Sequence, residues 1–174
     1  MQLYDPKLRF ADPLIEHWCN IRRGLELVPW EANLDPRQLQ PVLPSISIVD
    51  VADPEEAIVA VMGRNIRARF PPNLTHSDWY QFIPEVGAAV AKLAVRKLID
   101  TPCGVYYSYK ITDSSNAVEI GEALALPLRT HKSGKAASWI SLARIEGEGG
   151  LIIPPIRLDH VSLEFVDIGA AGAA

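Results

Sequence analysis

Histidines are the side chains in this sequence best suited to acid–base or metal chemistry, and their spacing decides whether they can work together. The four are scattered without an i, i+4 pair or an accompanying carboxylate pattern: His17, His76, His131 and His160. Such spacing predicts neither a zinc site nor haem ligation. We single out His76, because its loop could close over a sheet. A surface or capping role is the alternative.

Nucleophiles and carboxylates are no better placed for catalysis. Cys19 and Cys103 lie 84 positions apart without a basic partner nearby in the sequence, and there is no Gly-x-Ser-x-Gly elbow. Glu119, Glu122 and Glu146 could meet across strands, but charged residues there are typical of the wet face of a sheet. The stretch "GEGG" precedes "LIIPP" and not a helix with a lysine, so it predicts no phosphate site. We therefore expect no catalytic residues, no metal and no enzyme activity.

Composition narrows the classes of partner. The 174 residues are most simply one domain, since 48% hydrophobic and 22% charged residues supply both a core and a wet surface. The net charge of −4 comes from 21 acids and 17 bases without a block of either sign. This balance argues against nucleic acid and against an anionic membrane, which both need basic patches. No apolar run reaches the ~20 residues that span a bilayer, and the charged N-terminus does not resemble a signal peptide. We expect a cytoplasmic protein.

Apolar periodicity and turn residues predict the elements that must position any site. Helices are expected at 12–24, with Asp12 as N-cap, at 35–44 as a short piece, and at 84–100 as the longest helix. Strands are expected at 45–51, 56–63, 104–112, 117–130, 136–145 and 159–168. The last is either a sixth strand or an exchanged arm.

Three details of these elements bear on packing. The long helix is expected to present one face at helical spacing, made of Val86, Ala89, Val90, Leu93, Ala94, Lys97 and Leu98. In the strand at 117–130, alternate leucines share a face with Leu124. Proline 127 in that strand predicts a bulge or an edge.

The segment "GRNIRARF" at 63–70 resembles the flavin-contacting segment of LOV photoreceptors, which reads Gly-x-Asn-Cys-Arg-Phe. Ile66 stands at the position of the reactive cysteine. Because isoleucine has no nucleophile, it cannot form an adduct with a flavin. The interpretation that we favour is a one-turn helix with Ile66 and Phe70 inward and the arginines in solvent.

A longer stretch, from about His17 to Ile145, resembles a bacterial family of short stand-alone PAS-domain proteins that is distinct from LOV photoreceptors. The resemblance lies in "RRGLELVPWEANLDP", "LQPVLPSISIVDV", the "VMG" strand end, "NLTH" and "EIGEALALPLRTHKSG". The chain departs from the family at Gly63-Arg64, where members have Gly-Thr, and in "PPNLTH", where Pro72 and His76 replace small residues.

The order of elements and this resemblance imply an α+β fold. We expect a PAS-like five-stranded antiparallel sheet with helices on one face, an N-terminal helical extension and an extra C-terminal strand. The extension would occupy residues 1–45 and the PAS-like domain residues 46–146. A C-terminal extension with the added strand and a small-residue tail would occupy residues 147–174.

The resemblance implies a sensory or regulatory protein without catalysis, which binds a small molecule between the long helix and the sheet or a signalling protein through the sheet face. Buried phenols on the strand at 104–112 would need hydrogen-bond partners, which a polar ligand could supply; hydroxyls kept in water are the alternative. No cofactor is expected, and any ligand is unidentified. The residues expected at the ligand site are Arg64, Ile66, His76, Trp79, Phe82, Tyr107, Tyr109 and Leu124.

The second hypothesis is a protein-interaction module with a filled core and no ligand. In either case the N-terminal helix carries an apolar stripe, with Leu14, Trp18 and Ile21 at i, i+4 and i+7. We expect a homodimer through this helix and the sheet face, with Trp139 as a counterpart. The alternative is that the helix folds back onto its own sheet.

Overall fold

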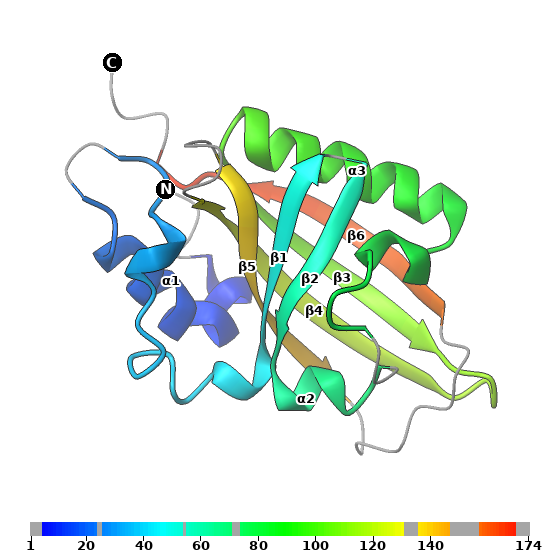
Figure 1. Cartoon of the computed structure of the whole chain (residues 1–174). Helices are drawn as coiled ribbons and strands as arrows, with labels where there is room; N and C mark the ends of the chain where they lie inside the picture. Colours follow the sequence, from blue (N-terminus) through cyan, green and yellow to red (C-terminus); the bar gives the residue numbers. More distant parts are fainter. Residues whose placement is uncertain are drawn as a thin grey trace.

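The computed structural model describes residues 5–23, 26–53, 55–70, 74–130, 136–146 and 157–169. Six described strands form one antiparallel sheet in the order β2-β1-β5-β4-β3-β6 (Figure 1). They are β1 (Ile46–Asp53), β2 (Glu56–Met62), β3 (Gly104–Thr112), β4 (Val118–Arg129), β5 (Ala136–Glu146) and β6 (Arg157–Val166). The predicted PAS-like α+β fold is therefore confirmed, and the extra segment is a sixth strand beside β3 and not an exchanged arm.

Short helical pieces and one long helix surround the sheet. They are η2 (Pro6–Ala11), α1 (Asp12–Asn20), η3 (Glu31–Asn33), η4 (Leu43–Ser45), α2 (Arg64–Arg67), η5 (Trp79–Phe82) and α3 (Glu85–Asp100). Helical structure begins before the predicted Asp12, because a carboxylate oxygen of Asp5 accepts a hydrogen bond from the Lys7 backbone and starts η2. The helix predicted at 35–44 forms only turns and η4, since Pro41 and Pro44 donate no backbone hydrogen bond.

Both faces of the sheet are covered in part by the same chain. The inner face packs against α2, η5 and α3, and the outer face packs against the N-terminal segment, residues 5–45. Strand β4 shows the division, because Ala123 and Ala125 belong to the inner core while Leu124, Leu126 and Leu128 belong to the outer core. In Figure 1, α3 and the N-terminal helices accordingly lie on different sides of the sheet.

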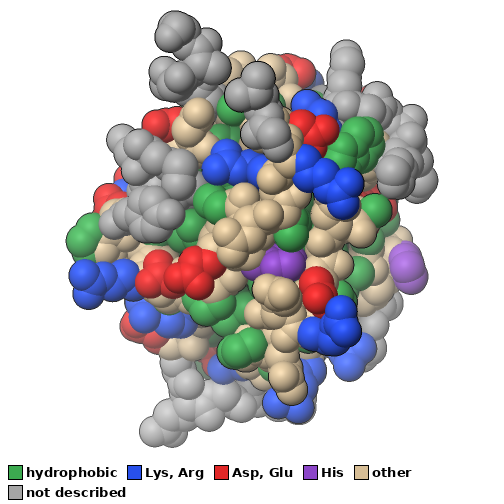
Figure 2. Space-filling view, turned by 90° about the vertical axis from the view of Figure 1, so that its left-hand side faces the viewer, with side chains coloured by type: hydrophobic (Ala, Val, Ile, Leu, Met, Phe, Trp, Pro, Cys, Tyr) green, Lys and Arg blue, Asp and Glu red, His purple; other side chains and the backbone are tan. Residues whose placement is uncertain are grey.

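The N-terminal segment supplies the outer core from its own chain. Leu8, Leu14 and Trp18 are fully buried there, and the indole N–H of Trp18 donates to the backbone carbonyl of Pro127 at 2.9 Å. Figure 2 shows that side of the molecule, where acidic and basic side chains are interspersed with hydrophobic ones. The stripe that we expected to form a dimer interface therefore faces inward. Trp139 is not its counterpart, because it belongs to the inner core.

The predicted apolar face of α3 is wrong in part. Val86 is 82% exposed and Leu93 is 64% exposed, whereas Leu98 is buried as expected. The buried side chains of α3 are Ala91, Ala94, Val95 and Leu98, so Ala94 also lies where it was predicted. Small residues let the helix axis approach the sheet closely, and periodicity alone cannot choose between two apolar faces of one helix.

Pro127 lies in the central strand β4, but at a position where β4 is paired with only one neighbouring strand. Strand β4 pairs with β3 only as far as Ala125, whereas its pairing with β5 continues to Arg129. The missing N–H of the proline is therefore tolerated at a local edge. A register shift follows between Leu128 and Arg129, as the predicted bulge or edge requires.

Candidate functional site

An interior cavity of about 30 Å³ lies between the inner face of the sheet and the segment that contains α2 and η5. A second cavity of about 40 Å³ lies beside it under α3. Trp79, Tyr107 and Trp139 line both cavities and separate them. Each has room for only one or two water molecules, far less than the ~300–1,000 Å³ of a typical ligand pocket.

A short hydrogen-bonded chain crosses the inner face at the first cavity. The hydroxyls of Ser47 and Ser141, which are opposite each other on β1 and β5, lie 2.8 Å apart. The hydroxyl of Tyr107 on β3 is hydrogen-bonded to Ser141, and burial raises the pKa of this phenol to about 12. Polar groups of three strands are thus linked inside an otherwise apolar layer.

Two further polar side chains at this cavity have no such partner. Tyr109 is 4% exposed and Trp139 is 6% exposed, and both line the cavity. Neither the hydroxyl of Tyr109 nor the indole N–H of Trp139 makes a hydrogen bond with any residue in the described ranges, and neither is among the fully buried polar atoms of those ranges that lack a partner. Burial raises the pKa of Tyr109, so its phenol stays protonated and can donate as well as accept.

Tyr109 is fixed in place by a glycine on the neighbouring strand. Gly121 on β4 is its direct partner in the β3–β4 register. A Cβ atom at Gly121 would lie 2.6 Å from a ring carbon of Tyr109, so only glycine leaves room for the ring to lie across β4. The Tyr107 and Tyr109 ring centroids are 5.9 Å apart.

Four of the eight predicted site residues line these cavities, namely Ile66, Trp79, Tyr107 and Tyr109. The one-turn helix predicted around Ile66 is confirmed as α2, with Ile66 and Phe70 both buried. Arg64 and Arg67 are exposed as predicted, but Arg69 is largely buried in an ion pair with Glu119 at 2.9 Å.

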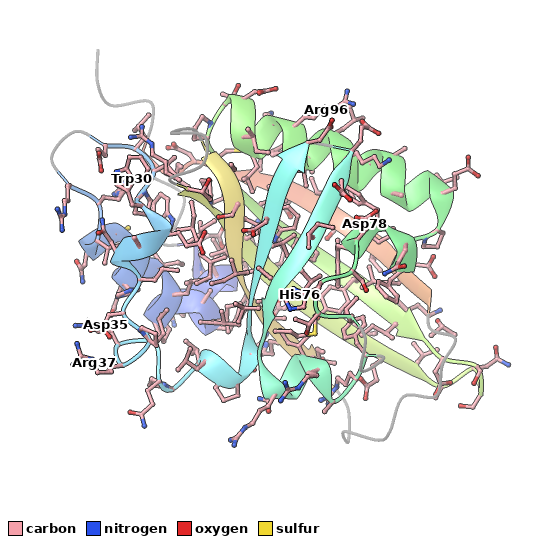
Figure 3. All side chains as sticks on the ribbon, in the orientation of Figure 1. Trp30, Asp35, Arg37, His76, Asp78 and Arg96 are labelled. Carbon is pink, nitrogen blue, oxygen red and sulfur yellow. The ribbon has the colours of Figure 1, made fainter. Side chains whose placement is uncertain are left out.

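The other four predicted residues lie away from the cavities. Arg64 is exposed on α2, and Phe82 packs against the inner core without lining either cavity. Leu124 lies on the outer face, fully buried under the N-terminal segment. His76 is exposed and in the left-handed region with φ 70°, and its backbone N–H donates to Val59 on β2. Figure 3 shows it on the segment that runs beside β2.

Sequence reasoning did not assign Ser47, Ser141 and Trp139 to the site. A signal was present, because each serine stands at an inward position of a strand that is otherwise apolar on that face. The glutamates do not meet as suggested: Glu119 pairs with Arg69 on the inner face, while Glu122 pairs with Arg144 on the outer face.

No group of three or more histidine, cysteine or carboxylate side chains in the described ranges could hold a metal ion. His131 and the side chain of His160 lie outside those ranges. Within the described part of the chain, no helix combines the length and the apolar character needed to cross a lipid bilayer.

No curated protein matches the chain. A family model described as PAS domain matches residues 9–141, which is most of the chain and includes β1 to β4 and the first part of β5. PAS domains are in general sensory or regulatory modules and are generally non-catalytic. With this match and an antiparallel sheet whose inner face is covered by α2, η5 and α3, the chain belongs to the PAS domain family.

Proposed function

We propose that this PAS domain is a non-catalytic sensor that binds a small polar molecule in its interior, at the cavity between the inner face of the sheet and α2. The observation that carries the proposal is that Tyr109 and Trp139, two side chains with polar groups that bond to no described residue, line one cavity beside the linked hydroxyls of Ser47, Ser141 and Tyr107. Such groups favour an occupant that accepts a hydrogen bond from the indole.

The size of the space limits what binds without movement. About 30 Å³ accommodates one or two water molecules, so a larger ligand requires the two cavities to merge. Trp79 is the side chain whose movement would join them, because it lines both and lies on the four-residue η5 and not in the sheet. Its present position rests on Phe70, whose ring centroid is 5.8 Å away.

A thermal-stability screen of small polar metabolites, followed by tryptophan fluorescence, tests this proposal. A ligand at one hundred times its Kd should stabilise the folded chain by about 2.7 kcal/mol. Trp139→Phe should weaken that response, because it removes the indole donor. The matched control is Trp30→Phe, on the N-terminal segment (Figure 3), because Trp30 lines neither cavity.

Two results would count against an interior site. One is the absence of any stabilising compound across the screen. The other is a compound whose effect is the same in Trp139→Phe, in Trp30→Phe and in the unchanged chain.

A protein-interaction module with a filled core is the second candidate. The small volume of the interior cavities favours it, as do Val118 and Ile120, which remain exposed on β4. In this function the uncovered part of the outer sheet face would bind the partner protein, which could be a second copy of the chain. The apolar stripe of α1 is not free for this, because it already packs against its own sheet. Sedimentation analysis of the unchanged chain and of Ile120→Lys tests the homodimer: a dimer that Ile120→Lys dissociates supports it, and a monomer in both excludes it.

A further inference from the structure

A pocket of about 330 Å³ opens at the surface near the C-terminal end of β5, and the interior site does not use it. Its walls come from the N-terminal segment, from α2 and from β5. Ile66 and Ala143 line both this pocket and the interior cavity, so they form the partition between the two spaces. The volume falls at the lower end of the range for small-ligand sites.

The pocket exists because two neighbouring strands end at different places. Strand β1 pairs with β5 only from Ser138 to Leu142, while β5 continues to Glu146. The last residues of β5 therefore have no strand on the β1 side, and side chains of both sheet faces border the pocket there: Leu142 and Arg144 from the outer face, Ala143 and Ile145 from the inner face.

One cation of the pocket is Arg69, just beyond α2. Its Nε donates to a carboxylate oxygen of Glu119 at 2.9 Å, and its Nη1 donates to the backbone carbonyl of Asn65 at 3.4 Å. The Nη2 group makes no hydrogen bond with any described residue. The Arg69 side chain is only 15% exposed. Its bonds to Glu119 and Asn65 hold the guanidinium in place and leave the Nη2 donor without a described partner at the pocket.

The other cation is Arg144 on β5. It forms an ion pair with Glu122 through Nη2, and its guanidinium lies 5.3 Å from the ring centroid of Phe10. Its Nε and Nη1 groups make no hydrogen bond in the described ranges. Neither glutamate partner lines the pocket. Two guanidinium groups with unused donors therefore border a pocket whose lining mixes polar and apolar side chains and includes no described carboxylate.

We propose that this pocket binds a small organic monocarboxylate with an apolar body. Guanidinium donors match the geometry of a carboxylate. Each arginine is already balanced by one glutamate, so the local charge suits a single negative charge better than the two of a phosphate. The apolar body would lie against Phe10, Pro41, Val42, Ile66 and Leu142. Asn65 links α2 to the end of η4 at the edge of the pocket, since its side-chain amide donates a hydrogen bond to the Ser45 hydroxyl at 3.1 Å.

The test is a titration of the full chain, by calorimetry and by amide NMR shifts, with hexanoate and benzoate as probes. Hexanol, benzyl alcohol and inorganic phosphate are the matched comparisons. We expect saturable binding of the carboxylates, with shifts at residues of α2 and the end of β5. Binding should be about tenfold or more weaker for the alcohols, which lack the charge-assisted hydrogen bonds.

Variants locate the site. Arg144→Gln, on an exposed side chain, should weaken carboxylate binding about tenfold. Arg69→Lys keeps a cation beside Glu119 but removes the Nη2 donor, and should also weaken it. Arg37→Gln, at an exposed ion pair with Asp35 (Figure 3), is the control and should bind normally. Trp139→Phe should also bind normally, which separates this pocket from the interior site.

The proposal is overturned by any of four results: no saturable binding of either carboxylate, equal binding of the alcohols, equal or tighter binding of phosphate, or unchanged affinity in both arginine variants.

Discussion

The two tyrosines on the inner face of β3 offer a sharp test of how the interior is organised. Tyr107 and Tyr109 are adjacent inward residues of one strand, but only Tyr107 has a hydroxyl that is hydrogen-bonded to Ser141. The ring of Tyr109 is buried where it packs over Gly121, and its hydroxyl makes no hydrogen bond with a described residue. Removing each hydroxyl by a Tyr→Phe substitution should therefore have different effects.

The magnitudes follow from this difference in partners. Tyr107→Phe removes one buried hydrogen bond but leaves Ser141 bonded to Ser47, so we expect a loss of about 1 kcal/mol in the free energy of unfolding. Tyr109→Phe removes a hydroxyl that makes no hydrogen bond with a described residue. The free energy of unfolding should then stay within about 0.5 kcal/mol of the unchanged chain or rise above it.

Urea denaturation, followed by tryptophan fluorescence and by far-ultraviolet circular dichroism, measures both effects. A loss of 1 kcal/mol lowers the urea midpoint by about 0.3–1 M at the usual denaturant slopes. A double-mutant cycle with Ser141→Ala should give a coupling energy near 1 kcal/mol for Tyr107 and near zero for Tyr109. Equal losses in the two variants, or equal couplings, would refute the assignment of an unpartnered hydroxyl to Tyr109.

Three more predictions concern the elements around the site. The ring of His17 is buried, its Nε2 accepts a hydrogen bond from the Asp35 backbone N–H, and burial holds its pKa below 6.5. The unfolded chain therefore binds more protons than the folded chain near and below pH 6.5, so the free energy of unfolding should fall as the pH drops from 7. His17→Gln should flatten this part of the pH profile. Gly63→Ala should cost about 1–3 kcal/mol in urea unfolding, because its Cβ would lie 2.6 Å from a backbone oxygen of the segment before β1; an unchanged midpoint would show that this segment can move. Trp18→Phe should cost about 2 kcal/mol or more in the same assay, because the Pro127 carbonyl loses its donor and the smaller ring leaves a void; a smaller cost would mean that the outer core repacks.

Local patterns in the sequence predict most of the strands and the longest helix. The helix predicted at 84–100 is α3 (Glu85–Asp100), and the strand predicted at 104–112 is β3 with the same bounds. The hairpin after β3 is also local in origin, since Asp113 accepts backbone hydrogen bonds from Ser115 and Ala117. Alternation and turn residues are properties of neighbouring positions, so a single sequence contains them.

Packing between segments that are distant along the chain could not be predicted from such local patterns. The apolar stripe of α1 is equally suited to a second chain or to its own sheet, and only the arrangement in space shows that it covers β4 and β5. The helix α3 has apolar residues on more than one side, and only its placement on the sheet shows that Ala91 faces inward while Val86 does not. The pocket beside Arg144 depends on where two strands end, which is a matter of register and not of residue type.

The contact between Trp18 and Pro127 joins residues 109 positions apart. During synthesis the N-terminal segment leaves the ribosome before β4 and β5 exist, so its leucines and its indole have nothing to cover. Contacts across such a distance along the chain slow folding, and apolar side chains that wait for them are open to aggregation. The domain is therefore complete only when its first helix meets strands made much later, which makes truncated or stalled chains the forms most in need of a chaperone.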